Sequence, residues 1–252
     1  MRTVRIFDTP EALGEAVAAD IAARLTPHFL LGCPGGRSPK PVYAALVRMD
    51  LDLSGLIIVM MDDYLTEVGG ILAHVDAAAH YSCRRFAHQD IQATLNTGRA
   101  PARQIADANV WFPDPANPAA YDRRIADAGG IDYFMLASGA SDGHVAFNPV
   151  GSDALTKTRI VDLTDETRRD NLATFPDFPN LDAVPRRGVT VGIATIAAAR
   201  ACGMVVWGAG KRRAYQHLSA ATAYDPAWPA TVWATCPDAT LYADRAAAGE
   251  TL

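Results

Sequence analysis

Asp142, Gly143 and His144 form the segment of this sequence best suited to proton transfer. A histidine titrates near neutral pH, so it can both take a proton from a ligand and return it. Asp142 stands across a glycine from His144, where its carboxylate can orient the imidazole or bind the ligand itself. A lone histidine is more often structural, but this one lies in a glycine-rich segment that follows an apolar run. We therefore predict that Asp142 and His144 are catalytic.

A second acidic segment, Asp62-Asp63, directly follows the continuous apolar run 56–61. Neighbouring side chains on an extended backbone point to opposite sides, so the two carboxylates are not expected to work as a pair. One of them can reach a ligand while the other is structural. The alternative is that both cap the following loop through hydrogen bonds to its backbone.

A glycine-rich turn, Gly35-Gly36-Arg37-Ser38-Pro39, separates a predicted strand from a predicted helix. Glycines let backbone N–H groups approach an anion closely, and a helix N-terminus adds partial positive charge. The Arg37 guanidinium and the Ser38 hydroxyl suit a phosphate. The alternative is a plain turn in which Ser38 caps the helix and Pro39 opens it. The spacing matches neither a P-loop nor a dinucleotide fingerprint.

Lys211 follows the glycine-rich Gly208-Ala209-Gly210 at the start of another predicted helix, where its ammonium can reach a phosphate. Taken alone, it is equally typical of an exposed helical lysine. The four cysteines are widely scattered and the histidines show no metal-ligand spacing. Neither a metal site nor a disulfide scaffold is therefore expected.

Short apolar runs alternate with amphipathic stretches, which is the pattern of a parallel sheet covered by helices. The predicted strands are 4–7, 28–31, 56–61, 131–137, 158–163, 189–193, 202–207 and 240–243. A helix is expected to open at Thr9-Pro10, and others near 81–86, 119–128 and after Lys211. The stretch 67–80 has no clear period and is predicted to be a lid or surface loop. Ligands of such sheets bind beyond the carboxyl ends of the strands, where the segments above would meet.

Composition narrows the classes of protein to which this chain can belong. Half of the 252 residues are hydrophobic and 20% are charged, which fits a folded core rather than disorder. The net charge of −5 and the mixing of acidic residues with arginines do not favour a nucleic-acid partner. Apolar runs are too short for a bilayer, and no signal peptide is visible, so a cytoplasmic location is expected. With no repeat or break in composition, residues 1–252 are predicted to form a single domain.

Taken together and in this order, these segments resemble the glucosamine-6-phosphate deaminase family and its relatives, the 6-phosphogluconolactonases. Residues 31–39 are similar to the phosphate loop of the family, and 61–64 to its Met-Asp-Glu-Tyr. Residues 142–148 are similar to its Asp-Gly-His-Ile-Ala-Phe-Asn, and Lys211 falls at its phosphate lysine. The resemblance implies a three-layer, Rossmann-like α/β fold with a mostly parallel sheet.

The resemblance also implies an aldose–ketose interconversion of a small sugar phosphate, with no metal or organic cofactor. His144, assisted by Asp142, would open the pyranose ring, and Asp62 would move a proton from C2 to C1. In the deaminases the 2-amino group leaves as ammonia, giving fructose 6-phosphate. The phosphate would be bound by residues of the first loop and by the lysine: Gly35, Gly36, Arg37, Ser38 and Lys211.

This sequence departs from the family pattern at several positions. The glutamate that follows Phe-Asn in the family is Pro149 here, which leaves the proton relay on the histidine incomplete. A phosphate-gripping arginine falls on Ala173, and Arg37, which resembles the first loop of the lactonases, can compensate for it. Arg159 matches a position that binds an activator in some deaminases, but the lysine position after it is Val161, so allosteric control is not expected.

Two other functions stay open. In a lactone hydrolase of the 6-phosphogluconolactonase kind the histidine would activate water; Pro149 and Arg37 favour this, whereas the lactonase run Asp-Gly-His-Thr-Ala-Ser-Leu-Phe is absent. A non-catalytic sugar-phosphate sensor is the third hypothesis. The identity of the sugar is open, as is whether the chain forms a homo-oligomer.

Overall fold

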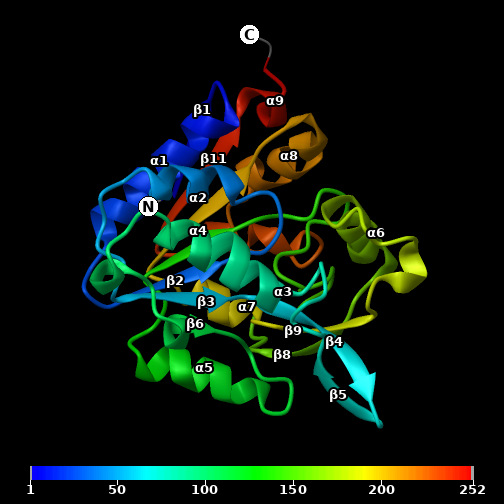
Figure 1. The fold of residues 1–252 in the computed structure, drawn as a ribbon. Coiled ribbons are helices and arrows are strands. Elements are labelled where there is room, and N and C mark those ends of the chain that lie inside the picture. Colours follow the sequence, from blue (N-terminus) through cyan, green and yellow to red (C-terminus); the bar gives the residue numbers. More distant parts are fainter. Residues whose placement is uncertain (1, 251–252) are drawn as a thin grey trace.

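Seven parallel strands form the central sheet of the computed structural model, which describes residues 2–250 (Figure 1). Their order across the sheet is β1-β11-β10-β7-β2-β3-β6. The strands are β1 (Arg2–Phe7), β2 (Phe29–Cys33), β3 (Leu56–Met60), β6 (Val110–Trp111), β7 (Tyr133–Leu136), β10 (Ala201–Val206) and β11 (Asp238–Asp244). The parallel sheet predicted from the apolar runs is confirmed, because central strands buried on both faces read as continuous apolar segments.

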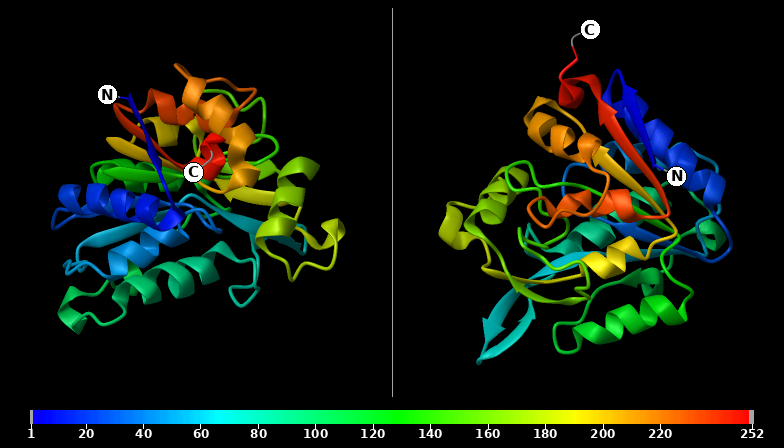
Figure 2. Two further views of the ribbon diagram at one scale, coloured as in Figure 1. Left: turned by 90° about the horizontal axis from the view of Figure 1, so that it is seen from above. Right: turned by 180° about the vertical axis from the view of Figure 1, so that it is seen from behind.

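Helices cover both faces of this sheet and complete three layers (Figure 2). One face packs against α1 (Pro10–Arg24), α2 (Lys40–Val47) and a continuous helical run made of α3 (Cys83–Phe86), a π-helical segment (Ala87–Gln92) and α4 (Ala93–Asn96). The other face packs against α5 (Pro118–Asp127), α7 (Ile193–Ala197), α8 (Arg212–Ala220), the 3₁₀ segment Pro229–Thr235 and α9 (Arg245–Ala248). The predicted three-layer α/β fold is thereby confirmed.

Helix α1 shows how the sequence determines one of these elements. The Thr9 hydroxyl accepts a hydrogen bond from the Ala12 N–H at 3.2 Å, and Pro10 opens the helix, as predicted. Such a cap stabilises a helix by about 1 kcal/mol. Leu13, Val17 and Ile21 repeat every fourth residue and are fully buried against the sheet, each contributing about 2 kcal/mol.

A second, antiparallel sheet continues beyond β3 in the order β5-β4-β9-β8. It consists of β4 (Asp62–Val68), β5 (Ile71–His74), β8 (Arg159–Asp162) and β9 (Arg187–Thr190). The prediction of a loop over 67–80 is therefore wrong in its first half, where β4 and β5 form a hairpin. Gly69 and Gly70 both have positive φ, as a two-residue hairpin turn requires. The flanking Val68 and Ile71 are exposed, so no buried face gives this hairpin an apolar period.

The order of the strands creates a crevice at one end of the main sheet. From β2 the chain adds β3 and β6 on one side, and then returns to add β7, β10 and β11 on the other. The loops after β2 and β7 therefore diverge, which is the point where open α/β sheets bind ligands. Helix α6 (Asp165–Thr174) and the second sheet lie beyond this end of the strands (Figure 1).

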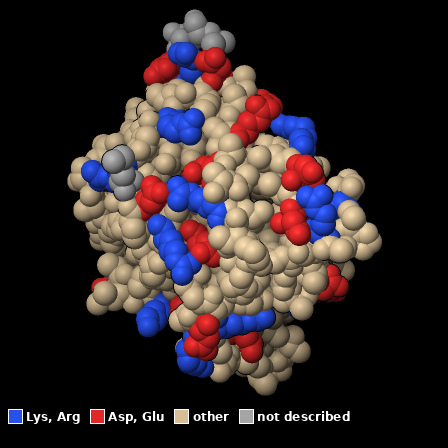
Figure 3. Space-filling model, turned by 90° about the vertical axis from the view of Figure 1, so that its left-hand side faces the viewer, with Lys and Arg blue, Asp and Glu red and all other residues tan. Residues whose placement is uncertain are grey.

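Lys and Arg are interspersed with Asp and Glu on the face shown in Figure 3. This view shows no broad basic surface of the kind that binds a nucleic-acid backbone. Within residues 2–250, no helix has both the length and the apolar character needed to cross a bilayer.

Candidate active site

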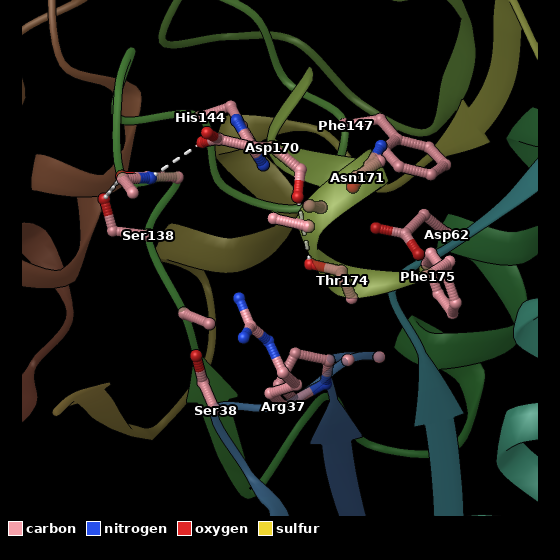
Figure 4. A pocket seen from close by; sticks show the side chains of 18 of the residues that line it. Arg37, Ser38, Asp62, Ser138, His144, Phe147, Asp170, Asn171, Thr174 and Phe175 are labelled. Carbon is pink, nitrogen blue, oxygen red and sulfur yellow. Dashed lines mark hydrogen bonds between the residues drawn. The ribbon is translucent and has the colours of Figure 1, made fainter. Parts of the chain in front are cut away.

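A cavity of about 360 Å³ lies at the carboxyl end of the sheet (Figure 4). It is lined by the loops that follow β2, β3, β7 and β10, and by α6. Seven residues predicted from the sequence line it together: Gly35, Gly36, Arg37, Ser38, Asp62, His144 and Lys211. The eighth, Asp142, lies behind His144 and contacts its ring. Four segments that are far apart in the sequence thus meet around one cavity.

Asp142 holds His144 by two hydrogen bonds to the same carboxylate oxygen. Asp142 Oδ1 lies 2.7 Å from His144 Nδ1 and 3.1 Å from its backbone nitrogen. Oδ2 accepts the Thr167 hydroxyl at 2.9 Å. Burial opposes ionisation, but the His144 bonds and charge and the Thr167 bond outweigh it and hold the pKa of Asp142 well below its usual range. The permanent carboxylate fixes Nδ1 as the donor, which leaves Nε2 for a ligand.

Two glycines allow the backbone to make this tight turn. A Cβ on Gly139 would lie 2.3 Å from His144 Nδ1, so any side chain there would collide with the imidazole. Gly143 has φ +69°, and a Cβ on it would lie 2.3 Å from the ring of Trp228. Trp228 is itself stacked on His217 of α8, with ring centroids 4.0 Å apart. The stacked pair Trp228–His217 therefore packs against the loop at Gly143.

The end of this loop is fixed by Asn148, which lies directly before Pro149. The Asn148 amide donates to the Val191 carbonyl at 2.8 Å, and its Oδ1 accepts from Arg159 at 2.8 Å. Arg159 is thus engaged in holding the loop. Pro149 is not among the described residues that line the cavity.

Asp62 presents its carboxylate to the cavity although its side chain is only 6% exposed. The Cys83 thiol approaches Oδ1 at 3.4 Å as a weak donor. Burial raises the pKa of Asp62 to about 7; the neighbouring Asp63 charge adds to this, while the Cys83 bond and the His144 charge oppose it. A carboxyl group that titrates near neutral pH can both accept and return a proton.

Asp63 points away from the cavity and is fully buried. Its Oδ1 accepts the backbone N–H groups of Tyr64 at 2.9 Å and Cys83 at 3.0 Å. Its Oδ2 lies 2.8 Å from His74 Nδ1 and 3.4 Å from Arg84 Nε. As expected, the two carboxylates differ: Asp62 faces the cavity, whereas Asp63 is buried and bonded to the backbone. That Asp62 acts on a ligand stays a prediction.

Positive charge gathers at the end of the cavity formed by the loops after β2 and β10. Arg37 and Lys211 both line it, and the Lys211 ammonium donates to the Ser138 carbonyl. Burial lowers the pKa of Lys211; the Asp170 charge opposes this effect and the Arg37 cation adds to it. A bound anion would favour the charged form of this lysine.

Ser38 does not cap α2. The helix begins at Lys40 after Pro39 and has no side-chain cap within the described part of the chain, so the alternative in which Ser38 caps the helix is wrong. The Ser38 carbonyl instead accepts the Trp207 Nε1–H at 2.9 Å, which ties the first loop to the end of β10. The Ser38 side chain lines the cavity, as does Ala173, where the family arginine would stand.

Helix α6 supplies site residues that the sequence analysis missed. Asp170, Asn171 and Thr174 line the cavity, and Thr167 contacts Asp142. No apolar stripe predicts which face of α6 points inward, because its buried residues are Thr167, Arg168 and Asn171.

Asp142, His144 and Asp170 offer donor atoms within 4.8 Å of one another, the one such group of potential metal ligands found among residues 2–250. Asp142 Oδ1 and His144 Nδ1 are already bonded to each other, and Asp170 Oδ2 accepts two backbone N–H groups. This arrangement suits proton transfer between the groups more than it suits metal coordination.

Comparison with known proteins connects this geometry to a family. The family model of glucosamine-6-phosphate isomerases and 6-phosphogluconolactonases matches residues 8–241. A glucosamine-6-phosphate deaminase of Beutenbergia cavernae is 35% identical, over 98% of this chain and 92% of the relative. One of Mycolicibacterium smegmatis is 34% identical, over 97% and 91%.

Solved structures show the same fold. A monomeric glucosamine-6-phosphate deaminase superposes with a TM-score of 0.85 at 23% identity, covering 98% of this chain and 99% of the other. A 6-phosphogluconolactonase from Trypanosoma cruzi superposes with a TM-score of 0.68 at 19% identity, covering 99% and 96%. The chain belongs to the glucosamine-6-phosphate isomerase/6-phosphogluconolactonase family.

Proposed function

We propose that this chain converts glucosamine 6-phosphate, or a close hexosamine 6-phosphate, into the ketose 6-phosphate and ammonia. The observation that carries the proposal is a buried carboxyl group, Asp62, whose pKa lies at about 7, in the same cavity as the Asp142–His144 pair. The reaction needs one group that opens the sugar ring and another that moves a proton between neighbouring carbons. The curated relatives named above share this activity by name.

The phosphate would lie at the positive end of the cavity, bound by Arg37, Lys211, Ser38 and the backbone of Gly35 and Gly36. His144 takes the proton of the C1 hydroxyl and delivers one to the ring oxygen, which breaks the C1–O5 bond and gives the open aldehyde. Asp142 stabilises the imidazolium that forms between these two transfers.

Asp62 then removes the proton from C2 and returns it to C1. The electron pair of the C2–H bond forms the C1=C2 double bond of an enol-type intermediate, while the carbonyl oxygen on C1 takes a proton from the 2-ammonium group. Protonation of C1 by Asp62 then leaves a hydroxymethyl group at C1 and a protonated imine at C2. Water adds to this imine and ammonia leaves, which gives the ketose. The oxidation of C2 is balanced by the reduction of C1, so no oxidant or reductant is needed, and water supplies the oxygen that replaces the amino group.

Hydrolysis of 6-phosphogluconolactone is the second candidate. Arg37 in the first loop and proline at position 149 favour it, and the fold is shared with lactonases. There His144 would activate water for attack on the lactone carbonyl, and Asp62 would have no proton to move.

One panel of assays separates the two candidates. Purified protein is incubated with glucosamine, galactosamine and mannosamine 6-phosphates, and ammonia and ketose phosphate are measured. The loss of freshly made 6-phosphogluconolactone is followed in parallel. Release of ammonia and ketose in equal amounts from one hexosamine, abolished in Asp62→Asn, supports the proposal. Lactone turnover that survives in Asp62→Asn, with no ammonia from any hexosamine, contradicts it.

We further infer that residues 1–252 act as one catalytic domain on a small molecule. The cytoplasmic location and the absence of a nucleic-acid partner stay predictions of the sequence.

A further inference from the structure

Asp170 places a second carboxylate beside His144. It projects from α6 into the cavity, and its Oδ2 accepts the backbone N–H of Ala140 at 2.9 Å and that of Ser141 at 3.3 Å. Figure 4 shows its carboxylate next to the His144 ring. Donor atoms of Asp170, Asp142 and His144 lie within 4.8 Å of one another. The imidazole therefore has a carboxylate hydrogen-bonded to Nδ1 and another within electrostatic range.

Among the other charged side chains of residues 2–250 that line the cavity, none is a carboxylate next to the His144 ring. Among the described residues that line the cavity, the acidic ones are Asp62 and Asp170. Asp62 follows β3 and lies on the other side of the cavity in Figure 4. The cations Arg37 and Lys211 lie on the phosphate side, and each would oppose protonation of the imidazole.

We infer that Asp170 is a positioning residue for catalysis, a second carboxylate that stabilises the His144 imidazolium during ring opening. The inference rests on the proposed function only in that His144 exchanges protons with a substrate. Opposite charges 4–6 Å apart favour the charged form of a group strongly when both are partly buried.

A purely structural role is the competing explanation. The two N–H bonds tie α6 to the segment 138–141, and this tie alone could account for the aspartate. Asp170→Asn separates the two roles. The amide oxygen of asparagine can still accept both N–H groups, so the tie is kept and only the charge is lost.

The first measurement is steady-state kinetics of Asp170→Asn on whichever substrate the wild type turns over. Loss of the charge is expected to lower kcat by about 10- to 100-fold, with KM changed less than threefold. Asp114→Asn is the matched control, because the exposed Asp114 also accepts a backbone N–H, that of Ala116, away from the cavity. A kcat for Asp170→Asn within twofold of the wild type, at unchanged melting temperature, would overturn the inference.

The second measurement needs no turnover. Diethyl pyrocarbonate modifies neutral imidazole, and the rate of modification of His144 can be followed by mass spectrometry at about pH 6.5. Losing the carboxylate leaves more of the imidazole neutral, so His144 in Asp170→Asn is expected to react several-fold faster than in the wild type and in Asp114→Asn. Equal rates would overturn the inference. If the wild type turned over neither substrate class, the proposed function would fail while this measurement still decided the role of Asp170.

Discussion

Asp62 and Asp63 are adjacent in the sequence yet experience opposite surroundings. Asp63 is satisfied by two backbone N–H groups and lies beside His74 and Arg84, so its charge is compensated. Asp62 has only the weak Cys83 thiol donor and a cavity in front of it. The protein therefore bears the cost of a poorly solvated carboxyl group at a position that faces the cavity.

This difference predicts a pH-dependent gain in stability for Asp62→Asn. The folded-state pKa of about 7 lies above the unfolded value of about 3.9, so ionisation of Asp62 costs stability progressively as the pH rises between these values. The neutral variant should be more stable than the wild type by about 1–2 kcal/mol at pH 5 and about 4 kcal/mol at pH 8. Chemical denaturation at both pH values measures this.

Asp63→Asn is the matched control and should behave in the opposite way. Removing its charge leaves Arg84 and His74 without their buried partner, so this variant should lose stability at both pH values. An Asp62→Asn variant that is less stable than the wild type at pH 8 would contradict the account of the acid pair.

At the scale of elements, the sharp turns that follow the strands decide which side chains point into the cavity. Gly143 combines a φ of +69° with contact to the face of Trp228, so both the backbone and the space exclude a side chain. Gly151, further along the same loop, has φ +86° but nothing in the described chain within 4 Å of a Cβ. An alanine at either position would adopt an unfavourable positive φ, but only at position 143 would its Cβ also collide with Trp228.

Gly143→Ala should therefore lower the free energy of unfolding more than Gly151→Ala does. Strain alone costs about 1–2 kcal/mol, and displacing Trp228 adds to it at position 143. We expect Gly143→Ala to lower kcat at least tenfold because His144 moves with the loop, and Gly151→Ala to keep most of its activity. Melting curves and kinetics of the two variants measure this. Equal losses in both would show that Trp228 does not position the loop.

The elements also show what the sequence could and could not reveal. Strands β2, β3, β7 and β10 are buried on both faces, so their apolar runs predicted the parallel sheet and the loops that follow it. The hairpin β4–β5 is exposed around its turn, at Val68 and Ile71, and α6 buries polar residues, so neither segment shows an apolar period. Asp170 was missed because its partners Ala140 and Ser141 are some thirty positions away in the chain. Only the folded arrangement brings them together.

At the scale of the whole molecule, the topology brings two cations from opposite sides of the crevice to one end of the cavity. Arg37 follows β2 and Lys211 follows β10, and they lie close enough for the Arg37 charge to add to the lowering of the Lys211 pKa. A chain of net charge −5 thus presents positive charge at this end of its cavity, which would favour entry of an anionic ligand.

Arg37→Ala and Lys211→Ala should each raise KM for a sugar phosphate about 10- to 100-fold, because each removes a charged hydrogen bond worth about 1.5–3 kcal/mol. The double variant should show less than the sum of the two losses in free energy if both cations bind the same phosphate. Lys157→Ala, at an exposed lysine outside the cavity, should leave KM unchanged. Losses that add fully would assign the two cations to separate groups of the ligand.

Turnover in deuterium oxide tests directly whether Asp62 moves a proton from C2 to C1 of a hexosamine 6-phosphate. We expect a ketose 6-phosphate that keeps the substrate proton at C1 in part of the product and carries solvent deuterium there where the Asp62 proton exchanged before its return. Ammonia should form in an equal amount, and Asp62→Asn should form no ketose. Ketose formed by Asp62→Asn at the wild-type rate, or a wild type that forms no ketose while it hydrolyses the lactone, would overturn this role of Asp62.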